Sequence, residues 1–169
     1  MSMKNKKGFT LVELLVVIAI IALIMVFAAV AVNSARSKQR DATRLSTVRQ
    51  MQSALEDFFN ESNLYPEGDL MPLGDPSQSS CLGSGGFASD CSGDNSTFLR
   101  IVQPTHEDGI EGIVKCGEPV RKAFCYTQLV EGESYVIHFE LENSLRAVGL
   151  QEGVNCATPD GMEAGICED

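Results

Sequence analysis

The residues best placed to do chemistry lie at the start of the chain, where Gly8, Phe9 and Glu13 precede a long apolar run. A cut between Gly8 and Phe9 would create an α-amino group four residues before the Glu13 carboxylate. A carboxylate at the edge of hydrocarbon is costly and usually functional. The spacing therefore suggests that the amine of one copy neutralises Glu13 of the next copy, which would favour assembly in a fixed register.

The element that must position this pair is the apolar run at residues 14–32, nineteen residues without a polar side chain. As a helix it spans about 28 Å, close to the ~30 Å hydrocarbon core of a bilayer. Lysines 4, 6 and 7 before it favour a cytoplasmic N-terminus. A cleaved secretory signal is disfavoured, since its shorter apolar core is followed by its cleavage site. A plain anchor, with Glu13 reaching the headgroups, is the other alternative.

The stretch from Gly8 to Ile20, GFTLVELLVVIAI, resembles the class III signal of type IV pilins and pseudopilins. In that family a prepilin peptidase cuts after the glycine and methylates the new terminal Phe. The resemblance implies that Gly8 ends the leader, that Phe9 becomes the N-methylated terminus and that Glu13 recruits the next subunit. Many members carry a proline in the span, but residues 14–32 contain none, so no kink is expected.

The helix is expected to continue to Ser62, because residues 33–62 contain neither Gly nor Pro. Apolar side chains recur there at helical spacing, namely Leu45, Val48, Met51, Leu55, Phe58 and Phe59. The predicted organisation is a leader (1–8), a transmembrane and assembly helix (9–32), its amphipathic continuation (33–62) and a globular extracytoplasmic head (63–169).

The strand signal comes late in the head. Alternating apolar residues predict a half-buried strand over residues 135–142, with residues 123–130 as its hairpin partner. Residues 145–150 are expected to add a third strand, and a short helix is expected at 96–102 in the loop-rich segment 67–122. The predicted fold is α+β and type IV pilin-like: a long N-terminal helix packed on a small antiparallel sheet, with disulfide-stapled loops.

The head also holds all six cysteines, an even number in a loop-rich region expected to lie outside the cytoplasm, which predicts disulfides. Of the fifteen possible pairings we favour nearest neighbours, because each pair brackets a turn: Cys81–Cys91, Cys116–Cys125 and Cys156–Cys167. Zinc is disfavoured because there is no Cys-x-x-Cys motif.

Charge is divided unevenly along the chain. Residues 1–50 carry a net charge of +6 and residues 51–169 a net charge of −16. An acidic head argues against nucleic-acid binding by the head. A cluster of five bases lies just beyond the span and is expected to contact lipid headgroups or acidic groups of neighbouring subunits: Arg36, Lys38, Arg40, Arg44 and Arg49.

No residue pattern in the head indicates an enzyme. His106 and His138 have no nearby nucleophile in a known motif and are interpreted as surface histidines. No metal and no cofactor are expected. Calcium in the acidic loops is the alternative, although their spacing matches no known calcium loop: Asp90 and Asp94, and Asp160, Glu163, Glu168 and Asp169.

The sequence is therefore interpreted as that of a structural subunit of a type IV pilus or a type II secretion pseudopilus. By the family resemblance its partners are copies of itself, prepilin peptidase, an inner-membrane assembly platform and, before assembly, membrane lipid. The precursor is expected in the cytoplasmic membrane with its head outside the cytoplasm, and the filament outside the cell or in the periplasm. The alternative is a single-pass anchored binding domain that does not polymerise.

Overall fold

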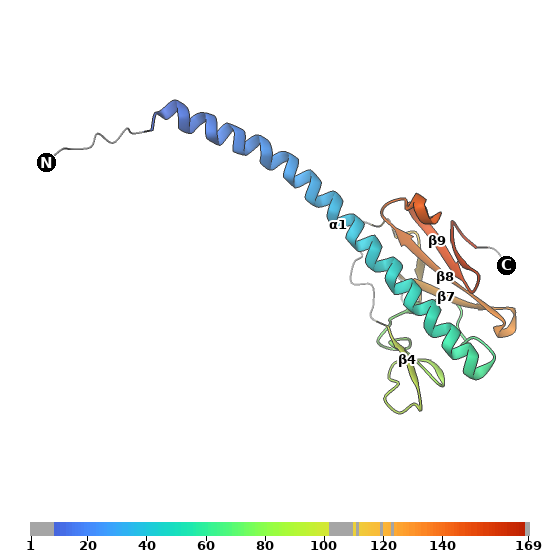
Figure 1. Ribbon diagram of the computed structural model, residues 1–169. Coiled ribbons are helices and arrows are strands. Elements are labelled where there is room, and N and C mark those ends of the chain that lie inside the picture. The colour runs from blue at the N-terminus through green and yellow to red at the C-terminus, as the bar shows by residue number, and fades with distance from the viewer. Residues whose placement is uncertain (1–8, 102–109, 111, 119, 123, 168–169) are drawn as a thin grey trace. The chain divides into compact units, whose positions relative to one another are not determined.

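The computed structural model describes residues 9–101, 110, 112–118, 120–122 and 124–167 (Figure 1). The expected leader, with Gly8, lies outside these residues. The chain forms two compact units that divide between Arg36 and Ser37, so the later part of the long helix belongs to the same unit as the strands. That helix, α1, covers Leu11–Ser62, and the predicted α+β, pilin-like architecture is confirmed.

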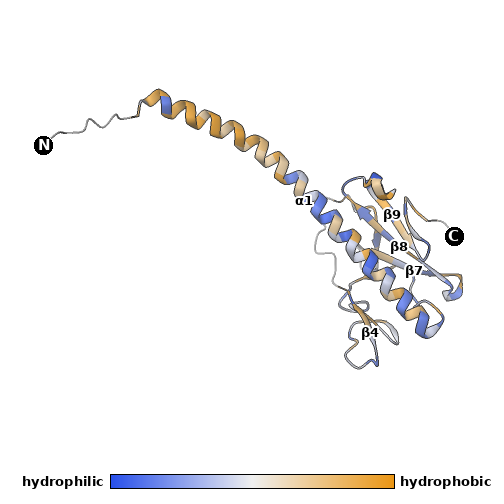
Figure 2. Ribbon diagram, viewed as in Figure 1, coloured by the Kyte–Doolittle hydropathy of each residue, from blue (hydrophilic) through white to orange (hydrophobic). Residues whose placement is uncertain are grey.

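α1 changes character along its length (Figure 2). Apart from Glu13 in its first turn, its first part is apolar on every side, and from about Asn33 the helix carries both polar and apolar residues. The helix ends where Asn63 adopts a left-handed conformation, with a φ of 60°. The Asn63 N–H donates to the Phe59 carbonyl at 2.7 Å, and asparagine tolerates this conformation well. Pro66, three residues later, disfavours helical geometry at Tyr65 and so opposes any continuation of the helix.

The second unit is built on a five-stranded antiparallel sheet with the order β1-β7-β8-β9-β10. β7 and β8 form a hairpin through a 3₁₀ turn, and β9 and β10 form the next hairpin. The strands are β1 (Met71–Leu73), β7 (Phe124–Leu129), β8 (Ser134–Leu141), β9 (Gly153–Thr158) and β10 (Gly161–Ala164). The predicted strand and its hairpin partner correspond to β8 and to β7, whose expected first residue, Ala123, lies outside the described residues.

Two predictions of secondary structure were wrong. The short helix expected at 96–102 is strand β4 (Thr97–Arg100), which pairs with β2 (Cys81–Gly83), while β3 (Gly86–Ala88) pairs on the other side of β2. Leu82 and Leu99 face one another in this ladder. The pairing is non-local, so the local sequence did not reveal it. Residue 102 lies outside the described residues.

The third strand was placed wrongly as well. Residues 145–150 fold back on themselves around a 3₁₀ turn, Arg146–Val148, because Leu145 and Leu150 bond to each other. Gly149, with a φ of 76°, makes this reversal possible. The strand that pairs with β8 is β9, a few residues later. A further two-stranded ladder joins β5 (Lys115–Cys116) to β6 (Arg121–Lys122).

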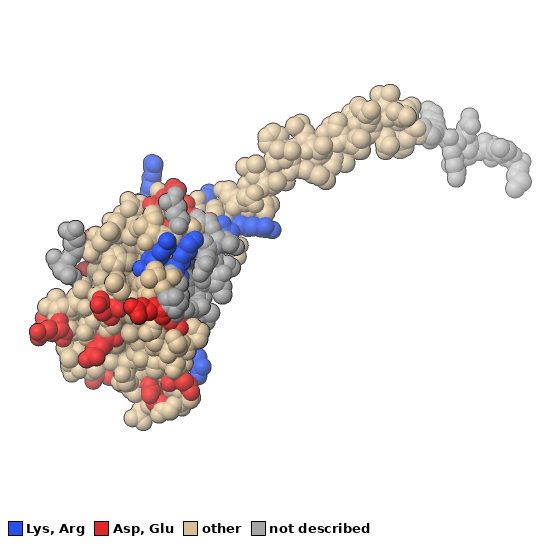
Figure 3. Space-filling view, turned by 180° about the vertical axis from the view of Figure 1, so that it is seen from behind, with Lys and Arg blue, Asp and Glu red and all other residues tan. Residues whose placement is uncertain are grey.

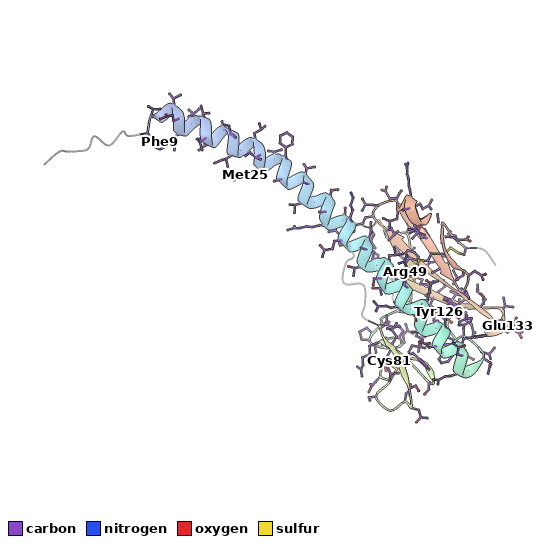
Figure 4. The ribbon with its side chains drawn as sticks, viewed as in Figure 1. Phe9, Met25, Arg49, Cys81, Tyr126 and Glu133 are labelled. Carbon is purple, nitrogen blue, oxygen red and sulfur yellow. A yellow bond between two sulfur atoms is a disulfide. The ribbon has the colours of Figure 1, made fainter. Side chains whose placement is uncertain are left out.

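The core lies between α1 and one face of the large sheet. Val48, Met51, Leu55 and Phe58 of the predicted apolar stripe are buried there, and Leu45 and Phe59 are partly buried. The sheet contributes side chains from β7, β8 and β9, which are Tyr126, Tyr135, Ile137, Phe139, Leu141 and Ala157. The helix crosses the strands in Figure 1, and Tyr126 lies close to it in Figure 4.

The expectation of a half-buried β8 needs correction, because its second face is also largely covered. Val136 and Glu140, which alternate along β8 with the core residues Tyr135, Ile137, Phe139 and Leu141, are 4 % and 5 % exposed. Gly112 and Ile113 donate backbone N–H bonds to the Glu140 carboxylate at 2.9–3.1 Å. The segment from Gly112 to Cys116 thus lies over this face, where Val114 and Cys116 join Cys125 and Val154 in a second apolar cluster.

Candidate assembly segment and its attachment to the head

The candidate assembly site begins at the N-terminus of α1, where Thr10 and Glu13 form a reciprocal cap. The Glu13 N–H donates to Thr10 Oγ1 at 3.2 Å, and Glu13 Oε2 accepts from the Thr10 N–H at 2.8 Å and from its hydroxyl at 2.9 Å. This is a capping box, which satisfies backbone donors that have no partner within the helix. The sequence signal, Thr-x-x-Glu, was present but was not used in the prediction.

The side chains that follow the cap have nothing to pack against within their own unit. The large apolar side chains of residues 14–32 are 43–67 % exposed, and Phe9 is 87 % exposed. Side chains project from every side of this part of the helix, as at Met25 (Figure 4). Among the described residues, α1 is the one helix long and apolar enough to cross a membrane.

An exposed apolar surface of this length requires a non-aqueous partner. Burial of apolar surface releases about 25 cal/mol per Å². Lipid or other helices of the same kind both supply such an environment. The geometry therefore permits two states for the segment, one in a bilayer and one in a bundle of identical helices.

Residues 3–29 match the prokaryotic N-terminal methylation motif. This chain carries the prepilin-type signal of type IV pilins and pseudopilins. No curated protein and no solved structure matches the chain. The prepilin signal thus covers the capped start of the helix and most of the apolar segment, and the match does not extend into the head.

The second part of the candidate site is the point where α1 meets the head. Asp41 is fully buried and Arg44 is 4 % exposed. Arg44 donates to Asp41 at 2.8 Å and to Glu142 at 2.7 Å, and Arg40 donates to both Glu142 oxygens at 2.5–2.6 Å. Asp41 also accepts bonds at 2.8–2.9 Å from the Glu142 N–H and from the backbone and side-chain nitrogens of Asn143. We call these five residues the ionic cluster.

The ionic cluster corrects the interpretation of the basic segment. Arg40 and Arg44 bind Glu142 of their own head. Arg36, Lys38 and Arg49 are exposed, which keeps them available for lipid headgroups or neighbouring subunits. Asp41, an acidic residue within this basic segment, is buried against Glu142 and Asn143. Its partners lie about a hundred residues away in the chain, so helical spacing could not reveal this burial.

The electrostatics of the ionic cluster favour its ionised form. Hydrogen bonds from Arg40 hold the pKa of the Glu142 carboxyl below its ordinary value of 4.5, although burial acts in the opposite direction. The wider head is acidic, with red and blue patches over its surface, in contrast to the uncharged apolar segment (Figure 3). The cluster thus attaches two arginines of α1 to a carboxylate of the acidic head.

The cysteines form the three nearest-neighbour pairs. Cys81–Cys91 closes a loop next to β2, Cys116–Cys125 ties β5 to β7, and Cys156–Cys167 ties β9 to the segment after β10. Their Cα–Cα distances are 6.1, 5.9 and 5.8 Å, within the ordinary range. The disulfides thus tie short strands and loops of the head to one another and to its main sheet.

The remaining candidates are not brought together. His138 is half-buried, which corrects the surface interpretation: its Nε2 is buried without a hydrogen-bond partner among the described residues, and burial lowers its pKa. His106, Glu168 and Asp169 lie outside the described residues. Asp90 accepts bonds from Ser92, and the described residues contain no group of three or more side chains arranged to hold a metal ion.

Proposed function

We propose that this chain is a structural subunit of a type IV pilus or a type II secretion pseudopilus. Prepilin peptidase cuts the precursor after Gly8 and methylates the new terminus at Phe9. The mature subunit then leaves the bilayer and enters a filament in which residues 9–32 of many copies form the central bundle. The observation that carries this proposal is the methylation motif at residues 3–29, which includes the start of a helix whose apolar side chains are exposed.

The Glu13 geometry suits a pairing between copies. Both cap bonds that the carboxylate accepts use Oε2, so Oε1 can accept the Phe9 amine of a neighbouring copy. In a helix bundle from which water is excluded, an unpaired carboxylate is costly and a paired one is not. The amine–carboxylate pair therefore sets the axial register, and burial of the apolar surface supplies most of the assembly free energy.

The remaining roles follow from the same proposal. The partners are prepilin peptidase, an inner-membrane assembly platform, lipid before assembly and further copies of the chain afterwards. The head lies outside the cytoplasm and binds no nucleic acid, since it is strongly acidic. The chain carries out no catalysis and needs no cofactor. A calcium ion in the acidic loops of the head is the alternative to a metal-free head.

The test is mass spectrometry of the N-terminal peptide from protein isolated from its native membrane or surface. A chain that begins at methylated Phe9 is the expected result. Glu13→Ala and Glu13→Gln variants should be processed and inserted normally but should yield few or no filaments, because both lack the charge that pairs with the amine. Normal filament yield from Glu13→Gln would show that charge pairing is not required.

The capping box supports a second candidate, because it gives Glu13 a purely intramolecular role. In that case the chain is a membrane-anchored extracytoplasmic binding domain that does not polymerise. It predicts that residues 1–8 remain on the chain in cells with an active prepilin peptidase. It also predicts that Glu13 substitutions change only the stability of the first helical turn.

A further inference from the structure

The contact between α1 and the head changes in kind along the helix. From Val48 onward the buried α1 side chains are mostly apolar and belong to the main core. Before Leu45 the buried α1 side chains in this unit are Asp41 and Arg44, and both are charged. The first two turns of the head section of α1, residues 37–44, are therefore held by the ionic cluster and not by apolar packing.

These two side chains bond to each other and to Glu142 and Asn143, which follow β8 directly in the head. Asp41 accepts bonds from the Glu142 and Asn143 backbone nitrogens, so the cluster ties the helix to the main chain of the head. The attachment is thus local, separate from the core in both composition and position.

A cluster of this kind has two states and few intermediate ones. Removal of the Glu142 charge takes one carboxylate away from two arginines, one of them buried, and a buried charge that loses part of its pairing costs more than the pair itself contributes. Water can reach the site, because Glu142 lines a cavity of about 360 Å³ together with Glu140 and Glu152. The charged groups near Glu142 include Arg40, Asp41 and Arg44 on α1 and the carboxylates of Glu140 and Glu152, which line the same cavity.

We propose that the ionic cluster is a latch: residues 37–44 of α1 attach to the head or detach from it as one unit, while the core contacts from Val48 onward stay intact. Opening lengthens the segment of α1 that is free of the head and exposes Arg40 and Arg44 for other anionic groups. This inference goes beyond the proposed function and does not depend on filament assembly, since it concerns a single copy.

The test is amide hydrogen exchange on the full-length chain in detergent micelles at pH 7, read by mass spectrometry. Glu142→Gln removes the charge that both arginines bind. We expect amides 41–47, which bond to carbonyls 37–43, to lose protection by about ten- to a hundredfold. Amides 52–62 of α1 and those of β7 and β8 should stay within about twofold of wild type, because apolar packing holds them.

Glu140→Gln is the matched control, because it removes a second buried carboxylate two residues away that bonds to Gly112 and Ile113 and not to α1. It should leave amides 41–47 unchanged. Arg40→Gln, at a site 25 % exposed, gives a milder version of the same loss in case Glu142→Gln fails to fold. Uniform loss of protection over the whole head, or unchanged protection of amides 41–47 in both latch variants, would overturn the latch.

Discussion

At the scale of single residues, two carboxylates of this chain combine a structural bond with a wider role. Glu13 closes the first turn of α1 through Thr10, and Glu142 receives two arginines from the helix. Each carboxylate lies where an ionised group without partners would be expensive. Their partners therefore decide how each group behaves, and both can be tested by conservative substitutions.

The first residue-scale prediction concerns the cap. Thr10→Ala should weaken the start of α1 by about 1 kcal/mol, because the Glu13 N–H loses its acceptor and the carboxylate loses a donor. Amides of residues 13–16 should then exchange several-fold faster by NMR of the full chain in micelles. Thr10→Ser keeps the hydroxyl and is the control, so equal effects of the two substitutions would contradict the capping role.

The second residue-scale prediction concerns pH. Since the pKa of folded Glu142 is depressed, its ionised form stabilises the fold fully above its ordinary value of 4.5, and this contribution is lost as the pH falls through the depressed pKa. Wild type should exceed Glu142→Gln by about 2–4 kcal/mol in unfolding free energy at pH 7. Urea unfolding in micelles from pH 7 to 3 should show this difference shrink below pH 4.5. A constant difference would contradict the assignment.

At the scale of elements, the head depends on two apolar clusters on opposite faces of one sheet. The main cluster lies under α1, and the smaller one, Val114, Cys116, Cys125 and Val154, lies on the other face. The disulfide Cys116–Cys125 is part of the smaller cluster, whereas Cys156–Cys167 ends beside Ile166, which is 70 % exposed. Disulfides that close loops of similar length therefore lie in different surroundings.

This difference predicts unequal losses of stability. Replacement of both cysteines by serine should cost about 2–3 kcal/mol from loop entropy at either pair, whose separations of 9 and 11 residues are similar. At Cys116–Cys125 both new hydroxyls are buried, whereas at Cys156–Cys167 only the one at Cys156 is, so the total loss should be larger at Cys116–Cys125. Chemical denaturation of both double variants measures this. Equal losses would show that the second cluster contributes nothing.

The elements also show how far the sequence could predict the fold. Local sequence signals predicted three features that the structure confirms. These are the long helix that ends at Ser62, the apolar stripe along it and the β7–β8 hairpin. β4 and β9 depend on pairing partners that local periodicity does not identify. The burial of Asp41 depends on Glu142 and Asn143, about a hundred residues away. Local signals thus predicted the long helix and one hairpin, whereas non-local contacts determined the remaining strands and the place where α1 joins the head.

At the scale of the whole molecule, the chain combines two units whose surfaces suit different surroundings. Residues 14–32 expose apolar side chains, whereas the second unit has its own core, three disulfides and an acidic surface. A unit with its own core and a high net charge meets the physical conditions for folding and solubility without lipid. The need for detergent should therefore belong to the first unit alone.

We therefore expect a chain of residues 33–169, exported to an oxidising compartment, to fold as a soluble monomer without detergent. It keeps every residue of the ionic cluster and every side chain of the two apolar clusters, and the described residues that it loses, 9–32, are all exposed. Size-exclusion chromatography with light scattering should give a monomer, and unfolding should be cooperative. A matched chain of residues 14–169 should aggregate without detergent, since it retains the apolar segment. Aggregation of the shorter chain would show that the head needs the segment as well.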